Sequence, residues 1–312
     1  MVAEDFISQG FPISKVLSKV GVASSSYYYR PKQTPKSRGR TKSTHTIDRN
    51  GKCTANSIVV KQMEVLLSQE FVDYGYRKVT YWLRKTYGYI INEKKVYRLL
   101  KEHKLLTYNR KGKRRGSRNW VKELVPQPSE VLNYLEFDIK YVFIHGKRRN
   151  ALLLSVIDVK SRWVLGQLLK WSIDQYDVKR LFDKIFSHYN LPKGIYVRND
   201  NGSQFESKLI QDYFKDKQVV QEFTLPATPE QNAHIEAYHS ILERAICRKF
   251  ELDDLKDAQE VWNRWIRFYN FDRIHSGLNY LAPQEYLKDK GVFKEPTDQL
   301  MTTLNCIPFS SL

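Results

Sequence analysis

Two carboxylates, Asp200 and Glu236, are the residues of this sequence best suited to catalysis, and 35 residues separate them. Asp200 follows a short apolar run at 194–197, which is typical of a buried strand that ends in a polar turn at Asn201 and Gly202. Glu236 lies in a segment whose apolar residues recur every three or four positions, and this spacing predicts a helix. A strand end and a helix can direct two carboxylates to one point, where they suit a hard divalent cation. The pattern predicts a metal site that needs a third oxygen ligand.

Asp138 is the candidate for this third ligand, on the first predicted strand of the core. It interrupts an otherwise apolar run in NYLEFDIKYVF, where an uncompensated carboxylate would be costly and a bound cation would remove the cost. Glu136, on the same strand face, is one alternative. Asp158, at the end of the next predicted strand, is another, although a carboxylate there can also cap the turn or pair with Arg162.

The sequence of the back half predicts the elements that would position these carboxylates. A meander of three β-rich runs is followed by alternating helices and strands, which indicates a mixed sheet with helices on its faces, an α/β core. The expected strands are 135–143, 151–158, 163–169, the run ending at Asp200, and 219–225; the expected helices are 174–189, 206–215, the one carrying Glu236, and 254–269.

Charge separates the chain into two parts. The net charge is +18, of which residues 1–132 carry +17 and residues 133–312 carry +1. A basic front half joined to a nearly neutral back half indicates that the front half binds a polyanion. Nucleic acid is favoured over a membrane surface, because the sequence predicts no long basic amphipathic helix.

Other features exclude several classes of protein. Cys53, Cys247 and Cys306 are few, odd in number and far apart, so the sequence supports neither a disulfide framework nor a zinc site. No apolar run reaches 18 residues, and the N-terminus begins with acidic residues where a signal peptide would be basic. We therefore expect a cytoplasmic protein that does not bind membranes.

The front half predicts helix-turn-helix units. Residues 11–30 read as two short helices with a turn at Gly21 and Ser24 or Ser25 as N-cap, although an ordinary helical hairpin would give the same pattern. Three helices are expected at 58–69, 76–87 and 92–103, and the last two leave basic side chains on their outer faces, as a recognition helix requires. Basic residues of the stretch 110–122 can add phosphate contacts, although a nuclear-import signal is a competing use of such a run. The predicted DNA-binding residues are Arg77, Lys78, Lys94, Lys95, Arg98, Lys113, Arg114, Arg115, Arg118 and Arg244.

Four ordered motifs resemble those of a known family. Asp138 in a strand, RNDNGSQF around Asp200, and TPEQNAHIE ending in Glu236 resemble the DDE motif of retroviral-integrase-like transposases, most closely the OrfB-type core of the bacterial insertion-sequence family called IS-three. Upstream, YGYRKVTYWLRKTYGYIINEKKVYRLLKEHKLL resembles that family's helix-turn-helix segment, and downstream YNFDRIHSGLNYLAPQEY resembles its closing motif.

The resemblance implies an RNase H-like catalytic core preceded by all-α helix-turn-helix DNA-binding regions. It implies that Asp138, Asp200 and Glu236 bind two Mg²⁺ ions, with Mn²⁺ as a substitute, and that one site cleaves and joins DNA strands at the terminal inverted repeats of an insertion sequence. The implied partners are double-stranded DNA, at least a second copy of the chain on that DNA, and an OrfA-like protein. A catalytically inactive DNA-binding protein and a nuclease that cuts without joining are the alternatives.

Some positions depart from the family pattern or have no fixed role. Family members commonly carry Lys or Arg seven residues after the last carboxylate, whereas this chain has Glu243, with Arg244 beside it. The zinc-binding domain of retroviral integrases has no counterpart. His234 and His239 flank Glu236, and for both a packed or hydrogen-bonded histidine is the favoured interpretation. The possible active-site support residues are Asn232, His234, Arg273 and His275; for the last two, DNA contact and structural support both stay open.

The expected organisation combines these regions in order. It comprises a small helix-turn-helix-like region at 1–30, a basic linker at 31–55, a helix-turn-helix DNA-binding domain at 56–108, a second basic linker at 109–132, the catalytic core with its C-terminal helix at 133–290, and a tail at 291–312.

Overall fold

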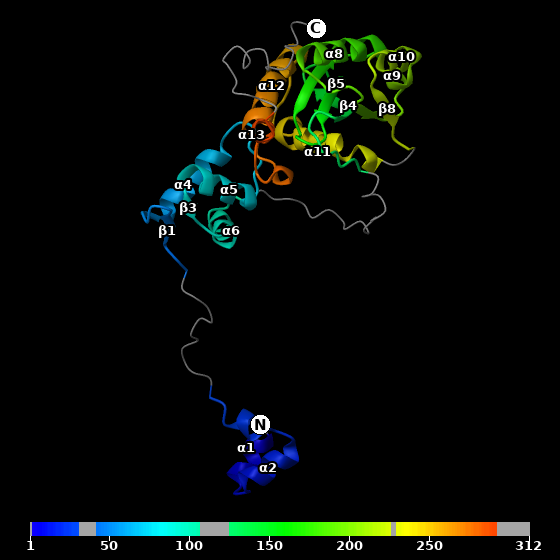
Figure 1. The fold of residues 1–312 in the computed structure, drawn as a ribbon. Coiled ribbons are helices and arrows are strands. Elements are labelled where there is room, and N and C mark those ends of the chain that lie inside the picture. The colour runs from blue at the N-terminus through cyan, green and yellow to red at the C-terminus, as the bar shows by residue number, and fades with distance from the viewer. Residues whose placement is uncertain (1, 31–41, 107–124, 226–228, 292–312) are drawn as a thin grey trace. The chain divides into compact units, whose positions relative to one another are not determined.

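A computed structural model describes residues 2–30, 42–106, 125–225 and 229–291 of the chain, which forms two compact units, 1–44 and 45–312 (Figure 1). The first unit packs around Ala3, Val16 and Leu17. Its helices are α1 (Val2–Ser8), α2 (Ile13–Val20) and α3 (Ser24–Tyr27). The expected pair of short helices and the turn at Gly21 are present. The expected N-cap, Ser24 or Ser25, was wrong: Ser24 is the first residue of α3, so Ala23 is the N-cap, and it makes no side-chain hydrogen bond.

The second unit begins with a helical region that also contains a small sheet. Its elements are β1 (His45–Asp48), β2 (Cys53–Ala55), α4 (Asn56–Leu67), α5 (Tyr76–Tyr87), β3 (Tyr89–Ile90) and α6 (Glu93–Glu102). Strand β1 pairs antiparallel with both β2 and β3.

This small sheet corrects two expectations. The region is not all-α, and the stretch 45–55, expected as linker, contains two of the strands. Strands of two to four residues are too short to show an alternating pattern. Their pairing joins segments far apart in the chain, as Ile47 opposite Ile90 illustrates.

The core of the second unit is a five-stranded sheet with the order β6-β5-β4-β7-β8. Its strands are β4 (Tyr134–Ile144), β5 (Arg149–Asp158), β6 (Val164–Lys170), β7 (Tyr196–Asn199) and β8 (Val220–Phe223). The first three form the predicted antiparallel meander, and β7 and β8 continue the sheet parallel to β4. The predicted mixed sheet is therefore confirmed, with β4 at its centre.

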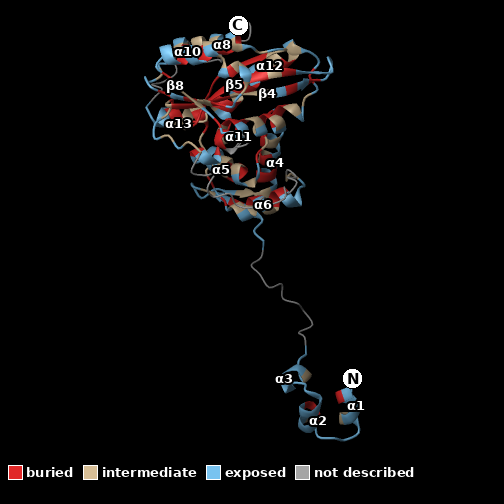
Figure 2. Ribbon diagram, turned by 90° about the vertical axis from the view of Figure 1, so that its right-hand side faces the viewer, coloured by how far each residue is buried: buried red, intermediate tan, exposed pale blue. Residues whose placement is uncertain are grey.

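Helices cover both faces of this sheet (Figure 2). On β4, Leu135 and Phe137 face one cluster with α8 (Gln175–His188) and α10 (Lys208–Asp216). Val142 and Ile144 face the opposite cluster with residues of α11 and α12. Successive strand residues alternate between faces, so Glu136 and Asp138 lie on the side of α11. The helices of this side are α11 (Ala233–Leu242) and α12 (Leu255–Arg267), with π-helical ends at Glu243–Cys247 and Phe268–Asp272. Helix α9 (Ser203–Glu206) packs on the other side, with α8 and α10, and Leu287 of α13 (Pro283–Asp289) belongs to that cluster too. Two 3₁₀ turns lie at Pro229–Asn232 and Ser276–Leu278.

The connection between α4 and α5 is docked on the core. Phe71 belongs to the α12-side cluster, and its ring lies 5.5 Å from that of Trp265 and 5.8 Å from that of Phe268, centroid to centroid. Beside it, Asp73 pairs with the buried Arg273 at 2.5 Å. No helix in the described ranges has the length and apolar character that crossing a membrane requires.

Candidate active site

Sheet register brings Asp138 and Asp200 together. Glu136 of β4 lies opposite Arg198 of the parallel neighbour β7. Asp138 follows Glu136 by two residues on β4, and Asp200 follows Arg198 by two residues, directly after the end of the neighbouring strand β7. Glu236 comes from the first turn of α11, which packs against β4 and β5. Two neighbouring strands and the helix that covers them thus supply the three predicted carboxylates.

The charges of Asp200 and Glu236 both act on Asp138. Burial raises the pKa of Asp138 to about 7, and the negative charges of Asp200 and Glu236 act in the same direction. Within the described residues, no three His, Cys, Asp or Glu side chains are grouped tightly enough to hold a metal ion as they stand. Asp200 and Glu236 therefore lie within electrostatic reach of Asp138, but in the described residues the three side chains are not arranged as a metal site.

Backbone groups fix the two aspartates. Asp138 Oδ1 accepts a hydrogen bond from its neighbour Ile139 N at 2.7 Å, and Asp200 Oδ1 accepts one from Gly202 N at 3.0 Å in the turn after β7. A Cβ at Gly202 would lie 3.1 Å from Asp200 Oδ1, so a larger residue there would crowd the carboxylate.

His239 is the histidine closest to the candidate site. Its Nδ1 lies 3.5 Å from Asp138 Oδ2, because it follows Glu236 by three residues and so shares its helix face. Burial, together with the charge of Lys140, lowers the pKa of His239 to about 3. The imidazole is therefore neutral near pH 7 and contacts Asp138 as a packed polar group. In the sequence, the position of His239 three residues after Glu236 already indicated that both lie on one face of the helix.

Glu136, the first alternative ligand, has a different task. Its side chain is fully buried, and its Oε2 accepts hydrogen bonds from His234 N at 3.0 Å and Ile235 N at 2.8 Å, at the start of α11. Burial raises its pKa to about 7. This carboxylate is bound to the backbone of the helix that carries Glu236.

Asp158, the second alternative, stabilises a turn. Its Oδ1 accepts from Leu132 N at 3.0 Å, while Oδ2 accepts from Ser161 N at 2.8 Å and from Ser161 Oγ at 2.5 Å. Arg162 donates to Val159 O instead of to this carboxylate. The cap that the sequence suggested for Asp158 is present, and the partner is Ser161.

The four possible support residues divide into two pairs. Asn232 and His234 lie at the start of α11, where His234 Nδ1 is 3.6 Å from Glu136 Oε1. Burial lowers the pKa of His234 to about 3. Arg273 is instead paired with Asp73, and its neighbour His275 is buried with its backbone N donating to Leu281 O at 3.0 Å. Arg273 and His275 are thus held by contacts within the second unit.

The predicted DNA-binding residues do not all face outward. Arg77 and Lys94 are exposed. Lys78 is not, because its amine lies over the Tyr74 ring, 5.1 Å from the centroid, and burial lowers its pKa to about 7. The expectation of an outward Lys78 was wrong, since helical spacing of apolar residues does not show where a long basic side chain folds back.

The remaining residues of this set have contacts of their own or lie outside the described ranges. Lys95 Nζ donates to His45 O at 2.5 Å, and Arg98 Nε lies 3.9 Å from Glu102. Arg244 lies 3.4 Å from Asp73. The predicted residues Lys113, Arg114, Arg115 and Arg118 lie outside the described residues.

Glu243, the residue that departs from the family pattern, has an internal partner. Its Oε2 lies 3.1 Å from Lys140 Nζ on β4, and Oε1 lies 3.6 Å from Arg248 Nε. Lys140 is two residues beyond Asp138, so Glu243 pairs with a cation close to the candidate site. An acidic residue fits this position for a local electrostatic reason.

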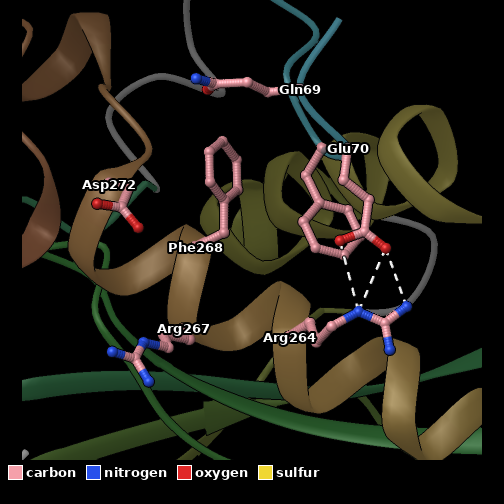
Figure 3. A pocket seen from close by; sticks show the side chains of 7 residues that line it. Gln69, Glu70, Arg264, Arg267, Phe268 and Asp272 are labelled. Carbon is pink, nitrogen blue, oxygen red and sulfur yellow. Dashed lines mark hydrogen bonds and ion pairs between the residues drawn. The ribbon is translucent and has the colours of Figure 1, made fainter.

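A separate pocket lies where the α4–α5 connection meets α12 (Figure 3). Arg264 pairs there with Glu70 at 2.9 Å. None of the three carboxylates contributes to its wall. The lining residues are Gln69, Glu70, Phe71, Arg264, Arg267, Phe268 and Asp272.

Comparison with protein families assigns both halves of the second unit. An HTH-like domain matches residues 58–114, and two descriptions of an integrase core domain match residues 128–229 and 217–283. The chain is 24% identical over 242 residues to the transposase for insertion sequence element IS904 of Lactococcus lactis, covering 74% of this chain and 94% of that protein. It is 23% identical over 292 residues to the putative transposase InsK for IS150 of Escherichia coli, covering 90% and 95%.

Among solved structures, the chain is similar to one titled as the intasome of simian T-cell lymphotropic virus in complex with PP2A regulatory subunit B56 gamma. The TM-score is 0.45 at 12% identity, covering 76% of this chain and 77% of that chain. It is also similar to the HTLV-2 integrase catalytic core domain in complex with magnesium, with a TM-score of 0.39 at 15% identity, covering 51% and 99%. The integrase core, the preceding HTH-like domain and the transposase relatives agree: the chain belongs to the insertion-sequence DDE transposases of the IS-three family, OrfB type, with a retroviral-integrase-like catalytic core.

Proposed function

We propose that this transposase cleaves and joins DNA strands at the terminal inverted repeats of its own insertion sequence, with Asp138, Asp200 and Glu236 as its catalytic carboxylates. The observation that supports this most strongly is their convergence. Strand β4, the end of the adjacent strand β7 and the covering helix α11 supply them, and the charges of Asp200 and Glu236 act on Asp138. Asp158 and Glu136, in contrast, already serve backbone N–H groups.

The donor set fits a hard divalent cation, because the three side chains offer only carboxylate oxygens. Asp138, Asp200 and Glu236 would hold Mg²⁺, with Mn²⁺ as a substitute and two ions as the expected number. Bound in this way, the ions supply activation of an oxygen nucleophile and stabilisation of the leaving oxygen. The protein's own contribution is to hold the carboxylates in place, with Ile139 N and Gly202 N bonded to the two aspartates and neutral His239 beside Asp138.

The partners follow from the reaction. Joining two ends of an insertion sequence to a target requires double-stranded DNA and at least two copies of the chain on it. The exposed Arg77 and Lys94 of the HTH-like domain are candidates for the DNA backbone contacts. An OrfA-like protein is a further expected partner, and the DNA substrate would place the protein in the cytoplasm of a bacterium.

Strand cleavage and joining on labelled insertion-sequence ends with Mg²⁺ tests the proposal. Asp138→Asn, Asp200→Asn and Glu236→Gln should each reduce both steps to below about one hundredth of the parent rate, since each removes a charged metal ligand. Asp212→Asn, an exposed carboxylate of α10, is the matched control and should retain the parent rate.

Full activity in any of the three site variants would contradict the proposal. Cut ends without joined products would indicate a nuclease, and tight salt-sensitive DNA binding without cleavage in Mg²⁺ or Mn²⁺ would indicate an inactive DNA-binding protein.

A further inference from the structure

The start of α11 is held by a side chain from another element. The first N–H groups of a helix have no partner within the helix, so a cap must satisfy them. The N-cap residue Asn232 makes no side-chain capping bond. Glu136 of β4 takes this role, with one oxygen, Oε2, accepting from both His234 N and Ile235 N.

The geometry of this contact is that of a strong anchor. Glu136 is fully buried, and a carboxylate at a helix N-terminus interacts favourably with the helix dipole. Its two bonds have ordinary N–H···O lengths, 3.0 and 2.8 Å. The residue directly after Ile235 is Glu236. The anchor therefore joins the strand of the first catalytic carboxylate to the helix turn that carries the third.

A second contact ties the same region to β7. Arg198 Nη1 donates to Gln231 O at 3.1 Å, in the turn before α11, while its Nη2 is bonded to Glu222 Oε2 of β8 at 2.9 Å. Arg198 lies opposite Glu136 in the sheet and precedes Asp200 by two residues. Both β4, through Glu136, and β7, through Arg198, therefore contact the backbone just before Glu236.

We propose that Glu136 is a positioning residue, which holds the start of α11 against β4 and so sets the place of Glu236 relative to Asp138. The inference rests on the proposed function, because it takes these carboxylates as the catalytic set. It assigns Glu136 neither metal ligation nor contact with the DNA. Its effect on catalysis passes through the helix.

The test compares Glu136→Ala, Glu136→Gln and Asp158→Ala in the full chain. Asp158 is the matched control, since it is an equally buried carboxylate that accepts backbone N–H bonds, but from Leu132 and Ser161 instead of α11. Two measurements are made on each variant: amide hydrogen exchange of peptides covering 229–242 without added metal, and the Mg²⁺ concentration that gives half-maximal strand cleavage.

Glu136→Ala should speed exchange at the start of α11 at least about tenfold, because the first turn loses its acceptor. It should also raise the half-maximal Mg²⁺ concentration about tenfold, the usual effect of losing support behind a metal ligand. Glu136→Gln keeps an oxygen that both N–H groups can reach, so both values should stay within about threefold of the parent. Asp158→Ala should lower the melting temperature and leave α11 exchange and the Mg²⁺ response as in the parent.

Two results would overturn the proposal. Unchanged α11 exchange with a raised Mg²⁺ requirement would make Glu136 a ligand itself, and equal effects in Asp158→Ala would make it a general stabiliser. If Glu136→Ala does not fold, Glu136→Asp, which retracts the carboxylate by one methylene, should give smaller changes of the same kind. Asp138→Asn separates the two proposals, since it should abolish cleavage without altering α11 exchange; retained cleavage there would contradict the proposed function alone.

Discussion

At the scale of single residues, the tasks of the buried carboxylates follow from what each one accepts. Asp158 receives three hydrogen bonds in its turn, and Glu136 receives two from α11. Asp138 receives one from its own neighbour and stands among like charges. Burial and neighbouring negative charges make the ionised form of such a carboxyl group unfavourable, and an adjacent cation would offset this cost. The functional group, a carboxylate, is the same in all three cases.

The role of Asp158 leads to a prediction about stability. Asp158→Ala removes the acceptor of Leu132 N, Ser161 N and Ser161 Oγ, at a position where Asp158 and Ser161 are fully buried. We expect the free energy of unfolding to fall by about 2 to 4 kcal/mol, because buried donors are left without partners. Urea unfolding measures it, and a loss below about 0.5 kcal/mol, the usual range of surface changes, would contradict this role.

The basic residues of the HTH-like domain lead to a second prediction. Arg77→Ala and Lys94→Ala should each weaken DNA binding and reduce the slope of log affinity against log salt by about 1, since each removes an exposed charge able to contact a phosphate. Binding titrations at several salt concentrations measure this slope.

Lys78→Met is the matched control on the same helix. Its amine is largely buried over Tyr74, so the salt slope should not change. A slope change equal to that of Arg77→Ala would show that Lys78 turns outward on DNA.

At the scale of elements, the connection between α4 and α5 is one of several contacts between the HTH-like domain and the core, beside the stacked rings of Tyr81 and Tyr280. Asp73, between α4 and α5, pairs with Arg273 at 2.5 Å and lies 3.4 Å from Arg244. The Arg273 side chain is 2% exposed and that of Asp73 is 9% exposed. A pair so well shielded from water is costly to break, since the remaining charge stays buried.

Asp73→Asn should therefore lower the free energy of unfolding by about 3 kcal/mol, because Arg273 loses its counter-charge. Glu70→Gln is the matched control in the same connection. Its partner Arg264 is 51% exposed and Glu70 is 41% exposed, so the expected loss is under about 1 kcal/mol. Thermal or urea unfolding of both variants measures the contrast, and equal losses would contradict it.

The same contact predicts a dependence on pH. Burial by itself raises the pKa of Asp73, but Arg273, Lys78 and Arg244 outweigh it, so the pKa lies below its ordinary value of 3.8. A carboxyl with a lowered pKa stabilises the fold above its unfolded pKa, and that contribution is lost as pH falls through the native pKa. The stability difference between parent and Asp73→Asn should be constant from about pH 7 to pH 5 and shrink below about pH 4. A difference that grows on acidification would contradict this assignment.

At the scale of the whole molecule, the two compact units have separate cores. Ala3, Val16 and Leu17 form that of unit 1–44. Removal of residues 1–44 should therefore leave the melting temperature of the remainder within about 2 °C of the parent, since the core clusters of the remainder contain only its own residues. Removal of residues 1–55 is the control, because it also deletes β1 and β2 and leaves β3 without its partner. Calorimetry should show a lower melting temperature only for the longer deletion.

Much of the fold and the three candidate carboxylates could be predicted from the sequence. Alternation and helical spacing report which face of an element is buried, and they predicted the meander, β7, β8 and the helices α8, α10, α11 and α12, but not the short helices α9 and α13. The charge difference between the halves indicated nucleic-acid binding, and the resemblance of four ordered motifs to a known family implied a DNA transposase. Local patterns failed for the small sheet β1–β3 and for Lys78, where short strands and a flexible side chain depend on distant partners.

Only the tertiary structure determined which carboxylates accept backbone hydrogen bonds. The partners of Asp158 at Leu132 and of Glu136 at Ile235 lie 26 and 99 residues away in the chain. Sequence by itself determined which residues are carboxylates and which strand and helix carry them. It also indicated that a carboxylate in an apolar strand needs a hydrogen-bond donor or a cation as partner. The fold determined which donors reach those groups, because a hydrogen bond depends on distances of about 3 Å that sequence spacing does not contain.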